Sequence, residues 1–350
     1  MSEEWRTTYF WRIIKELQHI KLRYRTRGLE MKRRILISSM ALMSLCFASS
    51  SRAEDYPSRP ITIEVPYSPG ASVDIMARMI GDRLRVRFNQ PVIVENHAGA
   101  SGQIGLNRVA RAKPDGYTIG VVQITNLALA PFVTAKLMYD PQKDFVPVVE
   151  IAENYLAIVS NVNGPLKNIK DVIDWAKQGK REVKLGSPSQ GGLPHLSVAL
   201  IAHENGFNVQ NISYKDVGPI VTDLASGQLD LGVSSYTSLA PSIQSGRVHL
   251  VGITAKDKFL PELPAIGDSL PGYSVPGWNG IVAPAGTDPK IVEKLNTAIN
   301  QILAEPDIQE KLKALGLIPT IKSPQQFAEL IKSDTDRFAK LVKDIGFQPL

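Results

Sequence analysis

Hydrophobic positions after residue 55 fall into two alternating patterns. Short β-branched runs, such as residues 61–65, alternate with longer stretches in which apolar side chains recur at every fourth position. In residues 72–88, for example, Met76, Ile80 and Leu84 show this spacing. A spacing of four places side chains on one face of a helix, whereas short β-branched runs are typical of buried strands. The alternation predicts an α/β fold with mainly parallel sheets flanked by helices.

The same two patterns set the limits of the expected elements. Strands are expected at residues 61–65, 92–95, 118–122, 156–160, 183–186, 212–214, 231–233, 250–254 and 281–283. Helices are expected at residues 72–88, 103–112, 169–178, 193–205, 219–226, 239–245, 289–304, 307–315 and 324–345.

Two proline-bearing segments interrupt the alternation and resemble connections between lobes. Residues 140–150 contain Pro141 and Pro147, and residues 261–278 hold four further prolines. If the chain leaves one lobe through the first segment and returns through the second, lobe 1 comprises residues 54–155 plus 276–350. Lobe 2 then comprises residues 156–275. In such pairs ligands bind between the lobes, at the carboxyl ends of strands.

The first 53 residues resemble a secretion signal preceded by an upstream extension. Met31 opens a basic tetrapeptide, an apolar run follows over residues 35–47, and small residues end it. The run is too short to span a bilayer, and Ala53 fits a cleavage site, so the mature chain would start at Glu54 in the periplasm. Met31 is the expected translation start, and a long leader from Met1 is the alternative. A lipid-attachment motif needs a small residue directly before its cysteine. Leu45, which precedes Cys46, is not small, so we expect no lipid anchor.

Charge changes meaning once this leader is removed. The full chain has 40 Lys and Arg against 34 Asp and Glu. Residues 1–53 carry 11 and 4 of these, so the remaining residues carry 29 and 30. The basic balance therefore belongs to the leader and does not indicate nucleic-acid binding.

The segment around the first strand and helix suggests an anion site. Residues 61–65 form the expected strand, a Pro/Gly loop follows, and a helix opens near Ser72. Such a loop directs backbone N–H groups toward a space at the positive end of a helix. Asp74 could contact the ligand or only complement the helix dipole. This arrangement suggests capture of a small carboxylate.

Motifs that would indicate an enzyme are incomplete. The glycines at Gly99, Gly102 and Gly105 have the wrong spacing for a dinucleotide loop. His203-Glu204 lacks the second histidine of a zinc protease motif, and residues 187–191 begin with serine where a nucleophile elbow needs glycine. We therefore expect no catalytic residues, no metal and no cofactor.

Seven segments, taken in order, are similar to the periplasmic solute-binding receptors of tripartite tricarboxylate transporters, also called the Bug family. They cover essentially all of residues 55–350. The segments are Tyr56-Pro-Ser-Arg-Pro-Ile, Pro66-Tyr-Ser-Pro-Gly-Ala-Ser-Val-Asp74, Gln90-Pro-Val-Ile-Val-Glu-Asn96, Gly99-Ala-Ser-Gly-Gln-Ile-Gly105, Lys113-Pro-Asp-Gly-Tyr-Thr118, Tyr139-Asp-Pro-Gln-Lys-Asp-Phe145 and Trp278-Asn-Gly-Ile-Val-Ala-Pro-Ala-Gly-Thr287.

The resemblance implies a two-lobed fold of the type II periplasmic-binding-protein kind and a ligand site between the lobes. In this family the loop equivalent to residues 67–74 wraps a carboxylate, and loops equivalent to 123–127, 187–195 and 234–238 complete the site. The expected ligand-binding residues are Tyr67, Ser68, Gly70, Ala71, Ser72, Asp74, Gln123, Asn126, Ser187, Gly191, Gly192 and Ser234. The chain departs from the common family pattern at residues 123–127, Gly191-Gly192, Asp216 and Ser234, so the resemblance does not identify the ligand.

We therefore expect a monomeric solute-binding protein that closes on a small mono- or dicarboxylate and delivers it to the membrane subunits of a tripartite tricarboxylate-type transporter. A periplasmic sensor for a signalling system and a periplasmic enzyme are the alternatives. Genes for membrane subunits nearby would favour uptake, a nearby histidine kinase would favour sensing, and turnover of the ligand would favour the enzyme.

Overall fold

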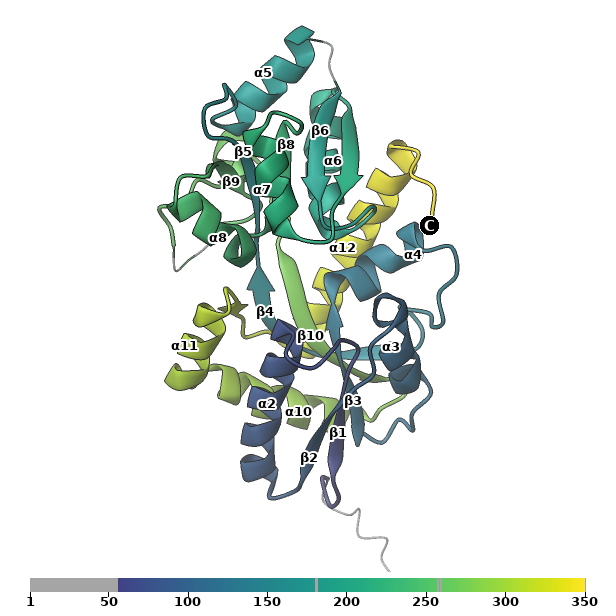
Figure 1. Ribbon diagram of the computed structural model, residues 1–350. Coiled ribbons are helices and arrows are strands. Elements are labelled where there is room, and N and C mark those ends of the chain that lie inside the picture. Colours follow the sequence, from purple (N-terminus) through teal and green to yellow (C-terminus); the bar gives the residue numbers. More distant parts are fainter. Residues whose placement is uncertain (1–55, 180–181, 257, 259, 350) are drawn as a thin grey trace, which may run out of the picture. The chain divides into compact units, whose positions relative to one another are not determined.

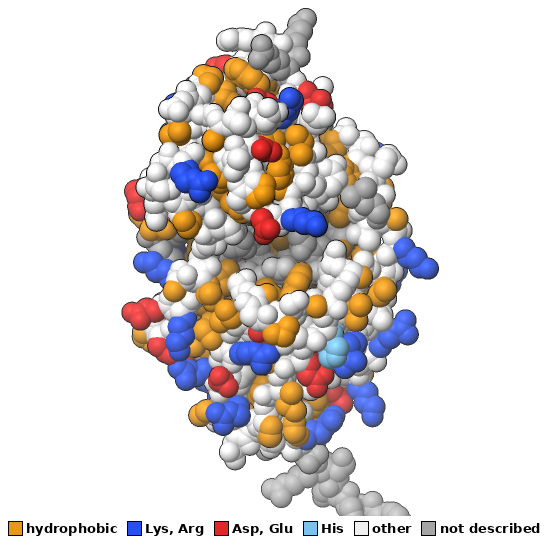
Figure 2. All heavy atoms as spheres, in the orientation of Figure 1, with side chains coloured by type: hydrophobic (Ala, Val, Ile, Leu, Met, Phe, Trp, Pro, Cys, Tyr) orange, Lys and Arg blue, Asp and Glu red, His pale blue; other side chains and the backbone are white. Residues whose placement is uncertain are grey.

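The structure is a computed structural model that describes residues 56–179, 182–256, 258 and 260–349 (Figure 1, Figure 2). The expected signal peptide and upstream extension lie outside these residues. No helix within the described part of the chain has the length and apolar character needed to cross a membrane.

The first sheet has six strands in the order β11-β4-β10-β3-β1-β2. β1 pairs in parallel with β2 and β3, whereas β10 is antiparallel to β3 and β4. The strands are β1 (Ile61–Val65), β2 (Val92–Asn96), β3 (Thr118–Gln123), β4 (Phe145–Asn154), β10 (Gly277–Pro284) and β11 (Ile318–Pro319).

The second sheet has five strands in the order β7-β6-β8-β5-β9. β6 is parallel to β7 and β8, and β5 is antiparallel to β8 and β9. The strands are β5 (Leu156–Asn161), β6 (Val183–Ser187), β7 (Val209–Ser213), β8 (Leu231–Ser235) and β9 (Val248–Ile253). The α/β prediction is confirmed, but both sheets are mixed, so the prediction of mainly parallel sheets was wrong.

Helices pack against both sheets (Figure 1). They are α2 (Ser72–Phe88), α3 (Gln103–Ala110), α4 (Ala130–Val133), α5 (Ile169–Gly179), α6 (Leu193–Asn205), α7 (Val217–Ala225), α8 (Tyr236–Gln244), α9 (Ile266–Ser269), α10 (Pro289–Leu303), α11 (Pro306–Ala314) and α12 (Pro324–Asp344). A short 3₁₀ turn η1 (Ala100–Gly102) precedes α3, and a π-helical turn η2 (Thr125–Leu129) precedes α4.

The expected spacing of apolar residues explains how α2 packs. Met76, Ile80 and Leu84 are fully or almost fully buried against the first sheet, and Asn89 ends the helix in the left-handed conformation. Burial of one such side chain stabilises the fold by about 1.5–3 kcal/mol relative to leaving it exposed. This packing fixes the end of α2 that follows the predicted anion loop.

The last helix, α12, is tied to the centre of the first sheet. Trp278 of β10 donates from Nε1 to the Asp334 carboxylate at 2.8 Å, and its ring meets Phe327 edge-on at 5.2 Å between centroids. Its N-terminus is capped by Ser323, whose hydroxyl accepts from Gln326 N–H. From this anchor α12 continues past η2 and α4 to α6 (Figure 1).

Residues 145–154 correct the sequence analysis, which assigned residues 140–150 to a connection. They form the long strand β4, which pairs with β10 through two register shifts and with β11. Pro147 lies within this strand, where its lack of an N–H argued against a strand assignment. The predictions of loops at residues 123–127 and 234–238 were also wrong. η2 begins at Thr125, and α8 begins at Tyr236 directly after β8 ends at Ser235.

Sheet membership changes between Asn154 and Leu156 and again between Ile253 and Gly277. The chain therefore leaves the first sheet after β4, builds the second sheet, and returns to the first sheet at β10. The lobe limits drawn from the sequence, residues 54–155 with 276–350 and residues 156–275, remain predictions.

We predict opposite effects for two Gly→Ala substitutions. A Cβ at Gly280 would overlap the Phe327 ring and lie 2.7 Å from the backbone oxygen of Val149. Gly280→Ala should therefore lower the free energy of unfolding by about 1–3 kcal/mol. Gly81 lies in the interior of α2, where an added Cβ would make ordinary contacts of 3.4–3.6 Å with Val92, Val94 and Ile63. Gly81→Ala should therefore raise the free energy of unfolding by about 0.5–1 kcal/mol.

Urea unfolding of both variants beside the unchanged protein measures the two effects. A neutral or stabilising Gly280→Ala would show that β10 and Phe327 do not pack as described.

Candidate functional site

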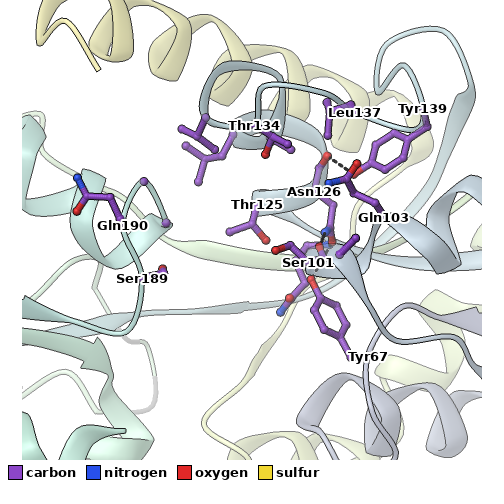
Figure 3. Close-up of a pocket in the computed structure, with 17 residues that line it drawn as sticks. Tyr67, Ser101, Gln103, Thr125, Asn126, Thr134, Leu137, Tyr139, Ser189 and Gln190 are labelled. Carbon is purple, nitrogen blue, oxygen red and sulfur yellow. Dashed lines mark hydrogen bonds between the residues drawn. The ribbon is translucent and has the colours of Figure 1, made fainter. Parts of the chain in front are cut away.

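A cavity of about 600 Å³ lies where loops from both sheets meet (Figure 3). From the first sheet it is lined by residues after β1, by residues 100–103 and by the chain from the end of β3 to Tyr139. From the second sheet it is lined by Ser189, Gln190, Gly191 and Gly192, which follow β6. β1, β3 and β6 all present their carboxyl ends here. This is the position at which α/β sheets bind ligands.

The loop between β1 and α2 is held by Asp74. Its carboxylate is almost fully buried and accepts hydrogen bonds from Gly70 N–H at 2.8 Å, Arg78 Nε at 3.1 Å and Asn96 Nδ2 at 2.8 Å. Burial alone would raise the pKa of Asp74, but the hydrogen bond from Arg78, those from Gly70 and Asn96, and the charge of Arg78 together hold it below its usual value. Asp74 thus stays ionised and fixes the shape of the loop.

The loop between β6 and α6 is held in a corresponding way by His195. Gly191 N–H donates to His195 Nδ1 at 3.0 Å, so the neutral ring carries its proton on Nε2. Burial lowers the pKa of His195 to about 4, which keeps the ring neutral near pH 7. In both loops the glycine has a positive φ, +83° at Gly70 and +71° at Gly191. The side chain that accepts its N–H lies four residues later.

Ser187 and Asn211 add further support behind the second loop. The Ser187 hydroxyl is fully buried and donates to Asn211 Oδ1 at 2.6 Å. The amide of Asn211 in turn donates from Nδ2 to Gln190 Oε1 at 2.7 Å. Ser187 therefore supports the pocket-lining residues from the sheet side.

Asn126 joins the walls of the cavity that come from the first sheet (Figure 3). Its Oδ1 accepts from Tyr67 OH at 3.2 Å and from Gln123 N–H at 2.9 Å, and its Nδ2 donates to the Ser101 carbonyl at 3.3 Å. Tyr139 OH donates to its backbone oxygen at 2.9 Å. Asn126 therefore organises the site.

Ala100 and Ser101 line the cavity in a strained conformation. Their φ angles are +46° and +55°, and they stand between Gly99 and Gly102, which also have positive φ. Residues with side chains rarely adopt this region, and such strain concentrates at functional sites. The Asn126 bond to the Ser101 carbonyl helps to hold this turn against the cavity.

The predicted site residues fall into three groups. Tyr67, Gln123, Asn126, Gly191 and Gly192 line the cavity. Ser68, Gly70, Ala71, Ser72 and Asp74 form the loop and helix start that follow Tyr67, outside the lining. Ser187 and Ser234 are buried within β6 and β8. Their roles toward a ligand remain predictions.

Sequence reasoning missed much of the lining. Ala100, Ser101 and Gln103 lie in the glycine-spaced segment that was considered as a failed dinucleotide loop and as a family segment, but not as part of the ligand site. Their position between β2 and α3 was the available signal. Leu129, Ala130, Val133, Thr134 and Leu137 follow the third strand in an apolar stretch that no predicted element covered.

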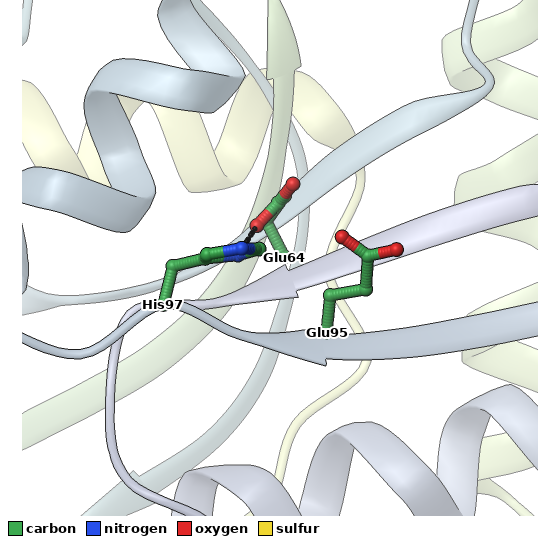
Figure 4. A group of neighbouring side chains, drawn as sticks. All are labelled: Glu64, Glu95 and His97. Atoms are coloured by element: carbon green, nitrogen blue, oxygen red, sulfur yellow. Dashed lines mark hydrogen bonds and ion pairs between the residues drawn. The ribbon is translucent and has the colours of Figure 1, made fainter.

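A second cluster of titratable groups joins β1, β2 and α3 away from the cavity (Figure 4). Glu64, Glu95 and His97 bring ligand-type atoms within 4.8 Å of one another. Arg108 donates from Nε to Glu64 at 3.1 Å and lies 3.6 Å from Glu95 Oε2, while His97 Nδ1 lies 2.6 Å from Glu64 Oε2. Because Arg108 already supplies the positive charge, we assign the cluster to ion pairing rather than to a metal.

We predict that His195 couples loop shape to pH. Because the folded pKa is about 4 and the ordinary value is 6.5, the unfolded chain binds this proton first as pH falls. The contribution of His195 is therefore complete above pH 6.5 and is lost toward pH 4, by up to roughly 3 kcal/mol. His195→Leu should lose this component and, at pH 7, cost about 1–3 kcal/mol because Gly191 N–H loses its acceptor.

His195→Asn is the matched control, since its Oδ1 can accept from Gly191 N–H and does not titrate. Urea unfolding from pH 7 to pH 4.5 should show equal shallow slopes for both variants and higher stability for Asn at pH 7. A slope in His195→Leu as steep as in the unchanged protein would refute the assignment.

Residues 76–347 match the family described as TctC, tripartite tricarboxylate transporter family receptor. Protein BugT of Bordetella pertussis is 30% identical over 326 residues, which cover 91% of this chain and 99% of BugT.

Two solved structures of similar proteins are described with a bound or added carboxylate. R. palustris Rpa4515 with adipate is 31% identical, with a TM-score of 0.69 over 85% of this chain and 100% of that one. MatC (Rpa3494) from Rhodopseudomonas palustris with bound malate is 27% identical, with a TM-score of 0.64 over 82% and 100%. The chain therefore belongs to the tripartite tricarboxylate transporter receptors of the Bug family, which are periplasmic solute-binding proteins rather than enzymes.

Proposed function

We propose that this protein captures a small organic carboxylate in the cavity between its two lobes, closes on it by a hinge motion and delivers it to a tripartite tricarboxylate-type transporter. The observation that carries this proposal is a pair of loops, one from each sheet, whose shapes are fixed by hydrogen bonds to Asp74 and His195 and which reach the cavity through Tyr67 and Gly191. The carboxylates bound by Rpa4515 and MatC support the ligand class.

Dipoles rather than charges would hold the anion. Among the described residues that line the cavity, none is Asp, Glu, Lys, Arg or His. The first turn of a helix leaves N–H groups without acceptors, and α2 starts at Ser72, five residues after Tyr67. Asp74 already occupies Gly70 N–H, and Ser72 and Val73 lie outside the cavity lining, so we assign the carboxylate to the hydroxyl and backbone groups of Ser101 and Thr125 beside Tyr67.

Closure would pivot on the passages between the sheets. The chain crosses directly from β4 to β5 through Tyr155 and returns between β9 and β10. A ligand that touches loops of both sheets binds the closed form more tightly and shifts the equilibrium toward it.

We predict that mono- or dicarboxylates raise the melting temperature of the protein, whereas neutral sugars and nucleotides do not. A carboxylate at 100 times its dissociation constant adds about 2.7 kcal/mol to the free energy of unfolding. Calorimetric titration should give one site per chain. Small-angle scattering should give a smaller radius of gyration with the ligand bound than without it.

Stabilisation by sugars or nucleotides alone would contradict the carboxylate assignment. Binding with no change in the radius of gyration would contradict hinge closure and leave the ligand class intact.

We predict that delivery requires export. Loss of the gene should abolish uptake of the bound carboxylate, and the full-length chain should restore it. A version without residues 31–53, which carry the predicted signal, should not restore it. N-terminal sequencing of the exported protein should begin at Glu54.

Unchanged uptake in the gene deletion, with ligand binding retained, would favour the sensor over transport. Rescue by the version without residues 31–53 would contradict the predicted signal.

A further inference from the structure

The cavity divides into a polar end and an apolar wall (Figure 3). At the polar end, Tyr67, Ser101 and Thr125 lie together beside Asn126. Asn126 has both its amide atoms engaged by protein groups, so it orients its neighbours. The polar end therefore offers hydroxyl and backbone groups for one anionic head.

The apolar wall is built from Leu129 at the end of η2, from α4 and from the segment after α4. Leu129 and Ala130 are buried there, and Val133 and Leu137 are half-buried with their side chains toward the cavity. Tyr139 completes this wall. Its hydroxyl hydrogen is bonded to the Asn126 backbone oxygen, so what Tyr139 adds to the wall is its ring.

A second carboxylate would meet the Thr134 hydroxyl at this wall but no charged side chain. Burying an unpaired charge beside leucine and valine is strongly unfavourable, whereas an apolar body there gains from leaving water. The cavity volume, about 600 Å³, is also within the range that accommodates ligands larger than a four-carbon diacid.

We infer that the preferred ligand is a monocarboxylate with an apolar body about the size of a benzene ring, its carboxylate at the polar end and its body against the wall of Leu129, Val133 and Leu137. This inference rests on the proposed function and narrows its ligand class.

Calorimetric titration at pH 7 with two matched series tests the inference. The first series is benzoate, phenylacetate and 3-phenylpropionate, and the second is succinate, malate and adipate. We expect at least one member of the first series to bind about tenfold or more tightly than every member of the second. Benzyl alcohol should bind more weakly than benzoate because it lacks the anionic head.

A matched pair of variants locates the apolar body. Val133→Thr keeps the shape and adds a hydroxyl to the wall, and should weaken binding of the best aryl acid about tenfold. Val86→Thr makes the same change at a side chain that is 69% exposed on α2 and should leave binding unchanged. Melting temperatures of the free proteins check that both variants fold.

The outcomes separate this inference from the proposed function. Tighter binding of the diacids would overturn the inference and leave carboxylate capture intact. If no member of either series binds, the inference and the proposed function are both overturned. Equal binding of the aryl acid by Val133→Thr and the unchanged protein would remove the apolar wall from the site.

Discussion

Two hydrogen bonds to glycine N–H groups set the shape of both loops at the cavity. Gly70 donates to Asp74 and Gly191 donates to His195, each across four residues and each from a glycine with positive φ. A left-handed glycine reverses the chain at the end of a strand, and the acceptor on the next helix fixes where the reversal points. Without such acceptors the two loops could adopt other shapes, and the positions of Tyr67 and Gly191 at the cavity would vary with them.

The two acceptor side chains, Asp74 and His195, differ in charge because their surroundings differ. Asp74 is held ionised by Arg78, Asn96 and a backbone N–H, so its charge is compensated beside the N-terminus of α2. His195 has no such compensation and burial keeps its ring neutral. Both therefore serve as acceptors near pH 7. Neither brings a net positive charge to the cavity, so selection of an anion must depend on N–H groups, hydroxyls and cavity shape.

Much of the fold could be predicted from the sequence where one interaction dominates. α2 and β1 occur at the predicted residues because helical apolar spacing and a β-branched run both point to one structure. β4 was missed because it carries Pro147 and pairs through two register shifts, so strand alternation is lost. The mixed order of both sheets was also beyond reach, since local patterns do not reveal which strands pair across long distances.

The site was predictable to the same degree and for the same reason. The loops after β1 and β6 contain glycines that the sequence analysis singled out. Five of the predicted ligand-binding residues line the cavity, namely Tyr67, Gln123, Asn126, Gly191 and Gly192. The apolar wall depends on a π-helical turn, and no residue pattern in η2 specifies that turn. The role of Asp74 as an acceptor for three donors was part of neither prediction from the sequence and could be seen only in the structure.

Gly191 connects the loop after β6 to the rest of the molecule. An added Cβ at this position would lie 2.8 Å from the Phe347 ring and 3.4 Å from Val133 Cβ. Val133 belongs to α4, and Phe347 follows α12, which is anchored on β10 by Trp278. The second-sheet loop is therefore seated between two elements packed on the first sheet, at a residue with no side chain to hold them apart. The His195 ring also packs near the Phe347 ring, with 6.0 Å between their centroids. His195 therefore both accepts the hydrogen bond that shapes this loop and contacts the residue that follows α12. A change in this loop would therefore alter the packing at the junction of the two sheets, where the proposed closure would occur.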